Sequence, residues 1–331
     1  MDRHKISVII PAYNAERTIG RTLASLLSNR DYIEEVIIVD DGSTDRTLVS
    51  AAEFLGHLNL VMISLDKNKG PGNARRVGIE NATGEWITFV DADDCVTASA
   101  FRYVSELWLN DEQLVLLHAK TIYYESGNFV SSNIDYSDMS CGGNFYRRSY
   151  LTDNGLVLKK YPRLCEDEFF NEVVTGYLAD DEYYHADHYN YPTYEVHHDM
   201  DDGLSYATRN WKDYLIKCRL EKARMVCDCL HKDLKDSLAA DFAFSFTLLN
   251  GLMQDADYEL TSADYADIFA DFKKTEQYYV RRFKGKREEL VKYYLDNKDA
   301  LYTGATATVG FEYEEMLGIL EFFNMIDGKV D

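Results

Sequence analysis

The stretch ISVIIPAYN (residues 6–14) places a short apolar run directly before a polar turn. The first five residues are nearly all apolar and β-branched, which is typical of a strand that is buried on both faces. The same arrangement recurs in VIIVDDGS (36–43) and in EWITFVDADD (85–94). The sequence therefore predicts three buried strands, each of which ends in a cluster of polar side chains.

Helical patterns separate these strands. Leucine and isoleucine recur at helical spacing in 15–29, a second helix is predicted over 45–56, and a third begins near residue 71. LVMISL (60–65) adds one more strand. Strands that alternate with helices over short connections indicate an α/β fold, a Rossmann-like and mostly parallel sheet flanked by helices. Ligands bind beyond the carboxyl ends of such strands, so the three polar clusters are expected to form one site.

The second part of the chain has a different character. EDEFFNEVVTGYL (166–178) reads as a helix with acidic residues in its first turn, and beyond about residue 205 most segments carry helical periodicity. We therefore predict two domains, a catalytic α/β domain over 1–205 and a helical region over 206–331. The helical region carries no motif, and formation of a homo-oligomer is one role that it allows.

Charge excludes some partners. The 331 residues include 35 Lys and Arg against 57 Asp and Glu, a formal net charge of -22. Nucleic-acid binding and adsorption through a polybasic patch both need basic surfaces, so neither is expected. The apolar run 6–10 is too short for a signal peptide or a transmembrane segment. We expect a cytoplasmic protein, at most peripheral to the inner face of the membrane.

The acids of DADD (91–94) suit a metal. Close carboxylates at the end of a buried strand offer the oxygen ligands that Mg²⁺ and Mn²⁺ prefer. A solvated acidic turn is the alternative for such a short motif. Its position beside the PAYN and DDGS clusters favours the metal.

Four motifs in order resemble a known family. They are SVIIPAYNAERTIGRTLASLL (7–27), VIIVDDGSTDRT (36–47), NKGPGNARRVGIENATGEWITFVDADD (68–94) and LCEDEFF (164–170). Together they resemble the family 2 glycosyltransferases, inverting enzymes of the GT-A fold, over roughly residues 5–200. The resemblance implies transfer of a sugar from a nucleotide-sugar donor, with UDP favoured, to a hydroxyl of a glycan or glycolipid acceptor. Synthesis of a cell-surface polysaccharide is the implied setting.

The resemblance also implies roles for individual residues. Asp167 matches the catalytic base and Glu166 an acid that orients the acceptor or supports the fold. Asp93 matches the ligand of Mn²⁺ or Mg²⁺, with His198, or else His197, as a further metal ligand. The residues that match the nucleotide-sugar site are Pro11, Ala12, Tyr13, Glu16, Asp40, Asn68, Gly70, Arg75, Asp91, Ala92 and Asp94.

Purely structural roles are the alternative interpretation for several of these residues, and a function without catalysis is the alternative for the whole chain. Tyr13 suits a core position, Asp40 a helix cap, and Arg75 a pair with surface acids. Gly142 and Gly143 suit either a plain turn or a close approach of an acceptor sugar. A catalytically inactive GT-A-fold carbohydrate-binding or scaffold protein is the alternative for the chain. A nucleotidyltransferase is disfavoured, because PAYNAERTIG (11–20) lacks a basic, Gly-rich phosphate loop.

Overall fold

The chain divides into two compact units. One comprises Met1–Tyr161 and Glu166–Ala207, and the other comprises Pro162–Cys165 and Thr208–Asp331. The roles predicted for 1–205 and 206–331 stay predictions. The computed structural model describes residues 5–98, 100–102, 113–116, 119–125, 128–135, 141–162, 166–178, 183–185, 194–199, 211–230, 234–236, 238–240, 242–243, 245, 262–286, 289–290, 292–293 and 295–296.

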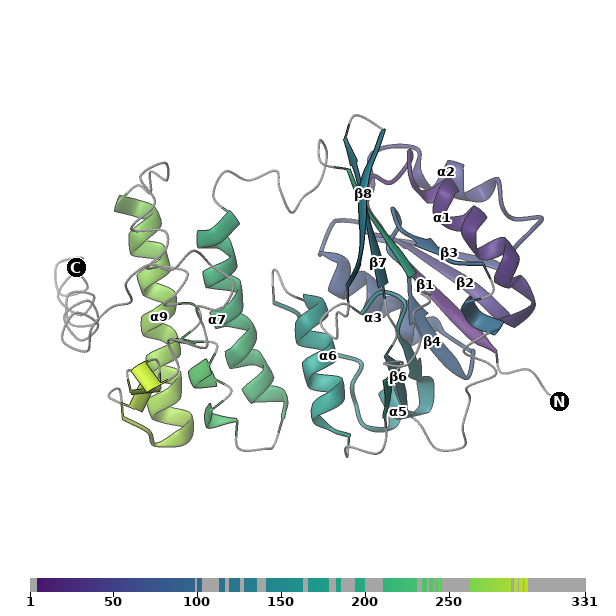
Figure 1. The fold of residues 1–331 in the computed structure, drawn as a ribbon. Coiled ribbons are helices and arrows are strands. Elements are labelled where there is room, and N and C mark those ends of the chain that lie inside the picture. Colours follow the sequence, from purple (N-terminus) through teal and green to yellow (C-terminus); the bar gives the residue numbers. More distant parts are fainter. Residues whose placement is uncertain are drawn as a thin grey trace. The chain divides into compact units, whose positions relative to one another are not determined.

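A seven-stranded sheet forms the centre of the first unit (Figure 1), in the order β10-β6-β9-β4-β1-β2-β3. The strands are β1 (Ile6–Ala12), β2 (Ile33–Asp40), β3 (Leu60–Ser64), β4 (Trp86–Phe89), β6 (Leu114–Leu116), β9 (Phe145–Arg147) and β10 (Tyr183–His185). Only β9 runs antiparallel to its neighbours among these described strands. The predicted mostly parallel α/β sheet is therefore confirmed.

The four helices predicted for this unit occur in the predicted order, and the short helix Arg148–Asp153 was not predicted. The helix expected over 15–29 begins later and finishes as a 3₁₀ turn, while the helices expected near 71 and at 166 begin as predicted. They are α1 (Ile19–Leu26), η1 (Leu27–Tyr32), α2 (Thr47–Ala52), α3 (Pro71–Asn81), α5 (Arg148–Asp153) and α6 (Glu166–Gly176).

Strand β1 is buried on both faces, as its β-branched sequence predicts. Ile6, Val8 and Ile10 belong to the core that also contains the apolar side of α1. On the other face α3 lies so close that a Cβ added at Gly78 would come within 2.3 Å of Ile9. The absence of a side chain at Gly78 thus lets α3 pack directly on the strand.

A second sheet lies next to the expected site. Its order is β5-β11-β7-β8, comprising β5 (Cys95–Val96), β11 (Tyr194–Asp199), β7 (Ala119–Glu125) and β8 (Asn128–Asp135). β5 follows directly after the acidic turn 91–94, and β11 pairs with it in antiparallel fashion. The sequence did not predict this pairing, which brings a late segment of the chain to the acidic turn.

The second unit contains two long helices, α7 (Trp211–Cys229) and α9 (Ser262–Phe283). Their contacts include a hydrogen bond of 2.7 Å from the Tyr278 hydroxyl to Asp228. In the part of the chain that the structure describes, no helix is both long enough and apolar enough to cross a membrane. Residues 201–210 lie outside the described residues, and so do residues 312–325 of the region that the sequence predicts to be helical.

Candidate active site

Loops from three neighbouring strands meet at one edge of the sheet. The register places Ala12 at the end of β1 beside Asp40 at the end of β2, and Ile9 beside Phe89 of β4. The Asp41 amide donates to the Ala12 carbonyl over 2.8 Å. Parallel neighbours carry their carboxyl ends to the same edge, so the three polar clusters come together as the sequence predicts.

The turns after β1 and β2 interlock. Asn14, in the left-handed region with φ of +50°, donates its amide to the Ser43 hydroxyl over 2.9 Å. The Glu16 carboxylate accepts the Arg46 amide over 3.0 Å. Tyr13, which precedes Asn14, is 49% exposed, so its ring does not belong to the core. This exposed ring on a braced turn is available to stack on a flat ligand.

Asp40 and Pro11 lie beneath this surface. Pro11 and Ala12 are buried in β1, and Asp40 is only 4% exposed. One Asp40 oxygen accepts the Ser43 amide over 3.0 Å, which closes the DDGS turn. The structure gives Asp40 a cap within the DDGS turn and not the helix cap of the plainer interpretation, because α2 begins at Thr47 with Arg46 as its N-cap. The role of Asp40 toward a nucleobase stays a prediction.

Asp41 joins the DDGS turn to the loop before α3. Its carboxylate accepts the amides of Lys69 and Gly70 at 3.0 and 2.6 Å. Gly42 has φ of +77°, and a Cβ there would come within 2.9 Å of the Asn68 amide nitrogen. The glycine thus permits a close approach of two backbones that places Asn68 and Gly70 beside the DDGS turn.

The acidic turn 91–94 is anchored from α1. The Thr22 hydroxyl donates to the Ala92 carbonyl over 2.9 Å, and the Asp94 amide closes the turn onto the Asp91 carbonyl over 3.1 Å. Ala92 is buried, whereas the Asp93 side chain is exposed. The turn therefore presents Asp93 outward on a fixed backbone.

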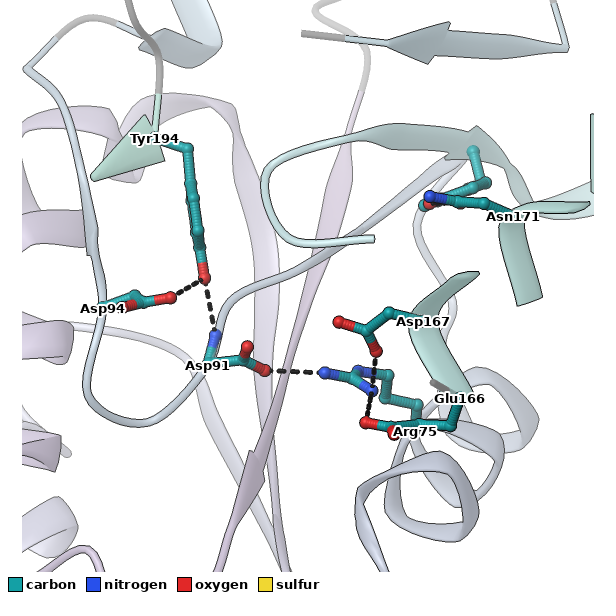
Figure 2. Close-up of polar contacts among 8 residues, drawn as sticks. Arg75, Asp91, Asp94, Glu166, Asp167, Asn171 and Tyr194 are labelled. Atoms are coloured by element: carbon teal, nitrogen blue, oxygen red, sulfur yellow. Dashed lines mark hydrogen bonds and ion pairs between the residues drawn. The ribbon is translucent and has the colours of Figure 1, made fainter. Parts of the chain in front are cut away.

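Asp94 points inward and is held by β11 (Figure 2). It is 4% exposed, and its two oxygens accept from the Tyr194 hydroxyl at 2.7 Å and from the His197 amide at 2.8 Å. Burial, together with the charges of Asp91 and Asp93, raises the pKa of Asp94 well above its usual range. The predicted contact of Asp94 with the donor sugar stays a prediction.

Tyr194 is the main residue that sequence reasoning missed. It donates to Asp94, and its oxygen accepts the Asp91 amide over 3.0 Å. Nothing local marks it among 25 tyrosines, because its partners lie about a hundred positions away along the chain.

Arg75 links the acidic turn to the start of α6 (Figure 2). Its side chain is 5% exposed, and one nitrogen contacts Asp91 at 2.8 Å. The other contacts Glu166 at 3.1 Å and Asp167. The plainer reading, a pair with surface acids, does not describe this cluster, because the guanidinium is buried. One cation thus joins acids from two different motifs.

Asp167 has the properties of a base that works near neutral pH. Burial, with Glu166 and Asp91 nearby, raises its pKa to about 7 against the opposing effect of Arg75. The buried Cys141 thiol forms a further hydrogen bond with the carboxylate. A carboxylate with this pKa accepts a proton readily, and about half of it is ionised at pH 7.

Gly142 and Gly143 do not face an open space. Cβ atoms added at these positions would come within 2.9 and 2.6 Å of Tyr194. The close approach that the sequence suggested for an acceptor sugar is made instead by the Tyr194 side chain.

Residues 7–164 match the family model described as glycosyl transferase family 2. This match covers just under half of the chain. The four motifs that resemble this family in the sequence supply the loops described above.

The chain is similar to two named glycosyltransferases. It is 29% identical over 276 residues to the poly(ribitol-phosphate) β-N-acetylglucosaminyltransferase TarS of Staphylococcus aureus, covering 75% of this chain and 45% of the relative. It is 28% identical over 157 residues to the UDP-Glc:α-D-GlcNAc-diphosphoundecaprenol β-1,3-glucosyltransferase WfgD of Escherichia coli, covering 47% and 56%. The chain thus spans about half the length of these relatives.

The fold likeness extends further than the family match. The crystal structure of S. aureus TarS 1–349 in complex with UDP-GlcNAc aligns with a TM-score of 0.65 at 21% identity, covering 97% of this chain and 92% of that one. At this identity the likeness establishes the shared fold.

A divalent cation, which the family resemblance implies, fits the acidic turn. Asp91, Asp93 and Asp94 lie close enough for their charges to act on one another, and Asp93 is exposed. No ready-made group of three His, Cys, Asp or Glu ligands occurs among the described residues. Mg²⁺ and Mn²⁺ commonly use one or two carboxylates plus substrate phosphates, which suits this site. His198 lies in β11, but its side chain is outside the described residues, and the His197 ring lies 3.7 Å from Glu195.

Proposed function

We propose that this chain is an inverting glycosyltransferase that moves a sugar from a nucleotide-sugar donor, a UDP-sugar, to a hydroxyl of a glycan or glycolipid acceptor. The activities in the names of TarS and WfgD support this choice of donor and acceptor classes. Cell-surface polysaccharide synthesis is the setting that both names suggest. A cytoplasmic location at the inner face of the membrane would suit a lipid-linked acceptor.

The observation that carries the proposal is the position of Arg75 between two groups of acids. Asp91 lies in the turn that follows β4, where the donor is expected, and Asp167 lies at the start of α6. Arg75 forms ion pairs with both. The donor-side acid and the base therefore belong to one charged cluster, as transfer of a group between two substrates requires.

In the proposed reaction, Asp167 accepts the proton of the acceptor hydroxyl. The hydroxyl oxygen forms a bond with the anomeric carbon from the side opposite the diphosphate. The bond between that carbon and the diphosphate oxygen breaks, and its electron pair leaves with the nucleoside diphosphate. Configuration is inverted because attack and departure occur on opposite faces. The pKa of Asp167, raised to about 7 by burial, suits this proton transfer.

Departure of the diphosphate adds negative charge near the acidic turn. A bound Mn²⁺ or Mg²⁺ would offset that charge, and Asp93, with Asp91 beside it, would hold the cation. Thr22 fixes the Ala92 carbonyl next to Asp93, so the backbone that presents this carboxylate is already ordered. Preorganisation of this kind avoids a rearrangement during the reaction.

On the nucleotide side, the exposed Tyr13 ring would pack on the base. Glu16, which is exposed, and Asn68 and Gly70, which border the DDGS turn, would line the rest of the nucleotide site. A scaffold that has lost activity is disfavoured, because Asp167, its ion-pair partner Arg75 and the acidic turn lie together.

The test is turnover of a panel of UDP-, GDP- and dTDP-sugars, followed by release of nucleoside diphosphate and by NMR of the product. We expect one UDP-sugar to be consumed with inversion at the anomeric carbon when a suitable acceptor is present. Release of nucleotide with retention of configuration would contradict the mechanism. Binding of nucleotide-sugars without any turnover across a broad acceptor panel would favour the scaffold.

A further inference from the structure

Strand β11 contacts both ends of the acidic turn. The Tyr194 oxygen accepts the amide of Asp91 over 3.0 Å, and the same hydroxyl donates to the Asp94 carboxylate over 2.7 Å. The His197 amide donates to the other Asp94 oxygen over 2.8 Å. Figure 2 shows the Tyr194 side chain extending from its strand to a hydroxyl that lies between the two aspartates.

The position of this hydroxyl is determined by packing. Tyr194 is 2% exposed, and its ring lies directly against Gly142 and Gly143, where any larger residue would collide with it. A ring enclosed in this way has little freedom to move, so the hydroxyl keeps its place. A hydrogen bond in such a buried site costs more to lose than one at the surface.

We propose that Tyr194 is a positioning residue, whose hydroxyl fixes the acidic turn so that Asp93 faces the donor diphosphate and Asp91 stays paired with Arg75. Asp94 then serves as the internal anchor of the turn, because both of its oxygens are engaged by β11. This assignment departs from the donor-sugar contact expected for Asp94. Its consequence for the donor rests on the proposed function, but the ordering of the turn does not.

The other side of the turn is held by different residues, which makes the contribution of Tyr194 separable. The Thr22 hydroxyl from α1 holds the Ala92 carbonyl, in the middle of the turn. Tyr194 holds the two ends. Loss of the Tyr194 hydroxyl should therefore loosen the Asp91 amide and the Asp94 side chain while α1 keeps the turn attached to the sheet.

The test uses Tyr194→Phe, which removes the hydroxyl and keeps the ring that fills the space above the glycines. Tyr150→Phe is the matched control, since its buried hydroxyl donates to the Val174 carbonyl over 2.7 Å, outside the Arg75 cluster. Amide hydrogen exchange of the intact chain, followed by NMR, measures how well the acidic turn is ordered in the absence of any ligand. We expect exchange at Asp91 to accelerate at least tenfold in Tyr194→Phe and to stay unchanged in Tyr150→Phe.

Calorimetric titration of UDP in the presence of Mn²⁺ then measures the affinity of the proposed donor site. The proposal predicts that Tyr194→Phe weakens UDP–Mn²⁺ affinity about tenfold or more, with Tyr150→Phe within twofold of the parent chain. An unchanged exchange rate at Asp91, or faster exchange with affinity within twofold of the parent, would overturn it. Failure of the parent chain to bind UDP would instead count against the proposed function, while the exchange data still decide the ordering of the turn.

A second variant covers the case in which Tyr194→Phe does not fold. Asp94→Asn keeps the shape of the side chain but leaves one oxygen for the two donors, Tyr194 and His197. We expect it to fold, to loosen the turn less than removal of the hydroxyl would, and to weaken UDP–Mn²⁺ binding. If Asp94→Asn bound UDP–Mn²⁺ with the affinity of the parent chain, and its Asp91 amide exchanged at the parent rate, the role of Asp94 as the anchor of the turn would be overturned.

Discussion

Arg75 and Asp167 form an ion pair in which the guanidinium is buried, although the two residues lie on separate helices and 92 positions apart. The same guanidinium also contacts Asp91, in the turn that follows β4. A cation shared in this way stabilises acids that would otherwise repel one another in a poorly hydrated place. It also fixes the distance between the acidic turn and the start of α6.

Replacement of Arg75 should destabilise the first unit. Arg75→Met leaves three carboxylates without their cation, and we expect a loss of about 3 kcal/mol in the free energy of unfolding, since the acids keep some contact with water. Denaturation in urea measures this. Arg76→Met is the control, because Arg76 pairs with the more exposed Glu80. That change should cost no more than about 0.5 kcal/mol. Equal losses in the two variants would contradict the role of the cluster.

Asp167→Asn should abolish turnover while it spares donor binding. Loss of a general base lowers kcat by about 10²- to 10⁴-fold, whereas UDP affinity should stay within about twofold, because the base faces the acceptor. The control is Glu168→Gln, which removes a charge from the same helical turn. Nearly normal kcat is expected for the control. A normal kcat in Asp167→Asn would rule out this residue as the base.

Activity should fall on the acid side of neutrality. The raised pKa of Asp167, about 7, means that the carboxyl takes up its proton as the pH drops below that value. The protonated group cannot accept the acceptor's proton, so kcat should decline about tenfold for each pH unit below about 6. A profile of kcat from pH 5 to 9 tests this. An acid limb near pH 4 would show that Asp167 is not the titrating base or that its pKa is normal.

Gly143→Ala should disturb the site through Tyr194. Gly143 has φ of +75°, and a Cβ there would lie 2.6 Å from the Tyr194 Cβ. We expect a loss of stability of about 2–3 kcal/mol from strain and collision together. Gly155→Ala is the control, with φ of +68° and nothing within 4 Å. Its cost should be strain alone, about 1 kcal/mol. Thermal unfolding measures both stability losses. Similar losses in the two variants would mean that the Tyr194 side chain can move away from the added methyl group without destabilising the protein.

The sequence predicted those features that are local or follow from strand order. Buried strands that end in polar turns placed Tyr13, Asp40 and Asp93 at one edge of a mostly parallel sheet, because parallel neighbours share that edge. The four family motifs pointed to Arg75 and Asp167 as site residues. The sequence did not reveal that the two are ion-paired.

The features that escaped prediction depend on long-range contacts. Tyr194 reaches Asp91 across 103 positions, and its strand joins a second sheet whose pairing has no signal in the local sequence. The contact of Gly143 with the Tyr194 ring likewise depends on how two distant segments pack. Periodicity reports which face of a strand is buried, but not which distant side chain covers it.

We propose that the acidic turn forms a nucleotide-sugar site that depends on a divalent cation. Calorimetric titration of UDP into the purified chain, with Mn²⁺ and with EDTA, tests it most directly when repeated on Asp93→Ala. We predict micromolar binding that requires Mn²⁺ and is lost in the variant, because Asp93 is the exposed carboxylate of the turn. UDP binding of equal strength in EDTA and in Asp93→Ala would show that neither a cation nor Asp93 is needed to bind the nucleotide.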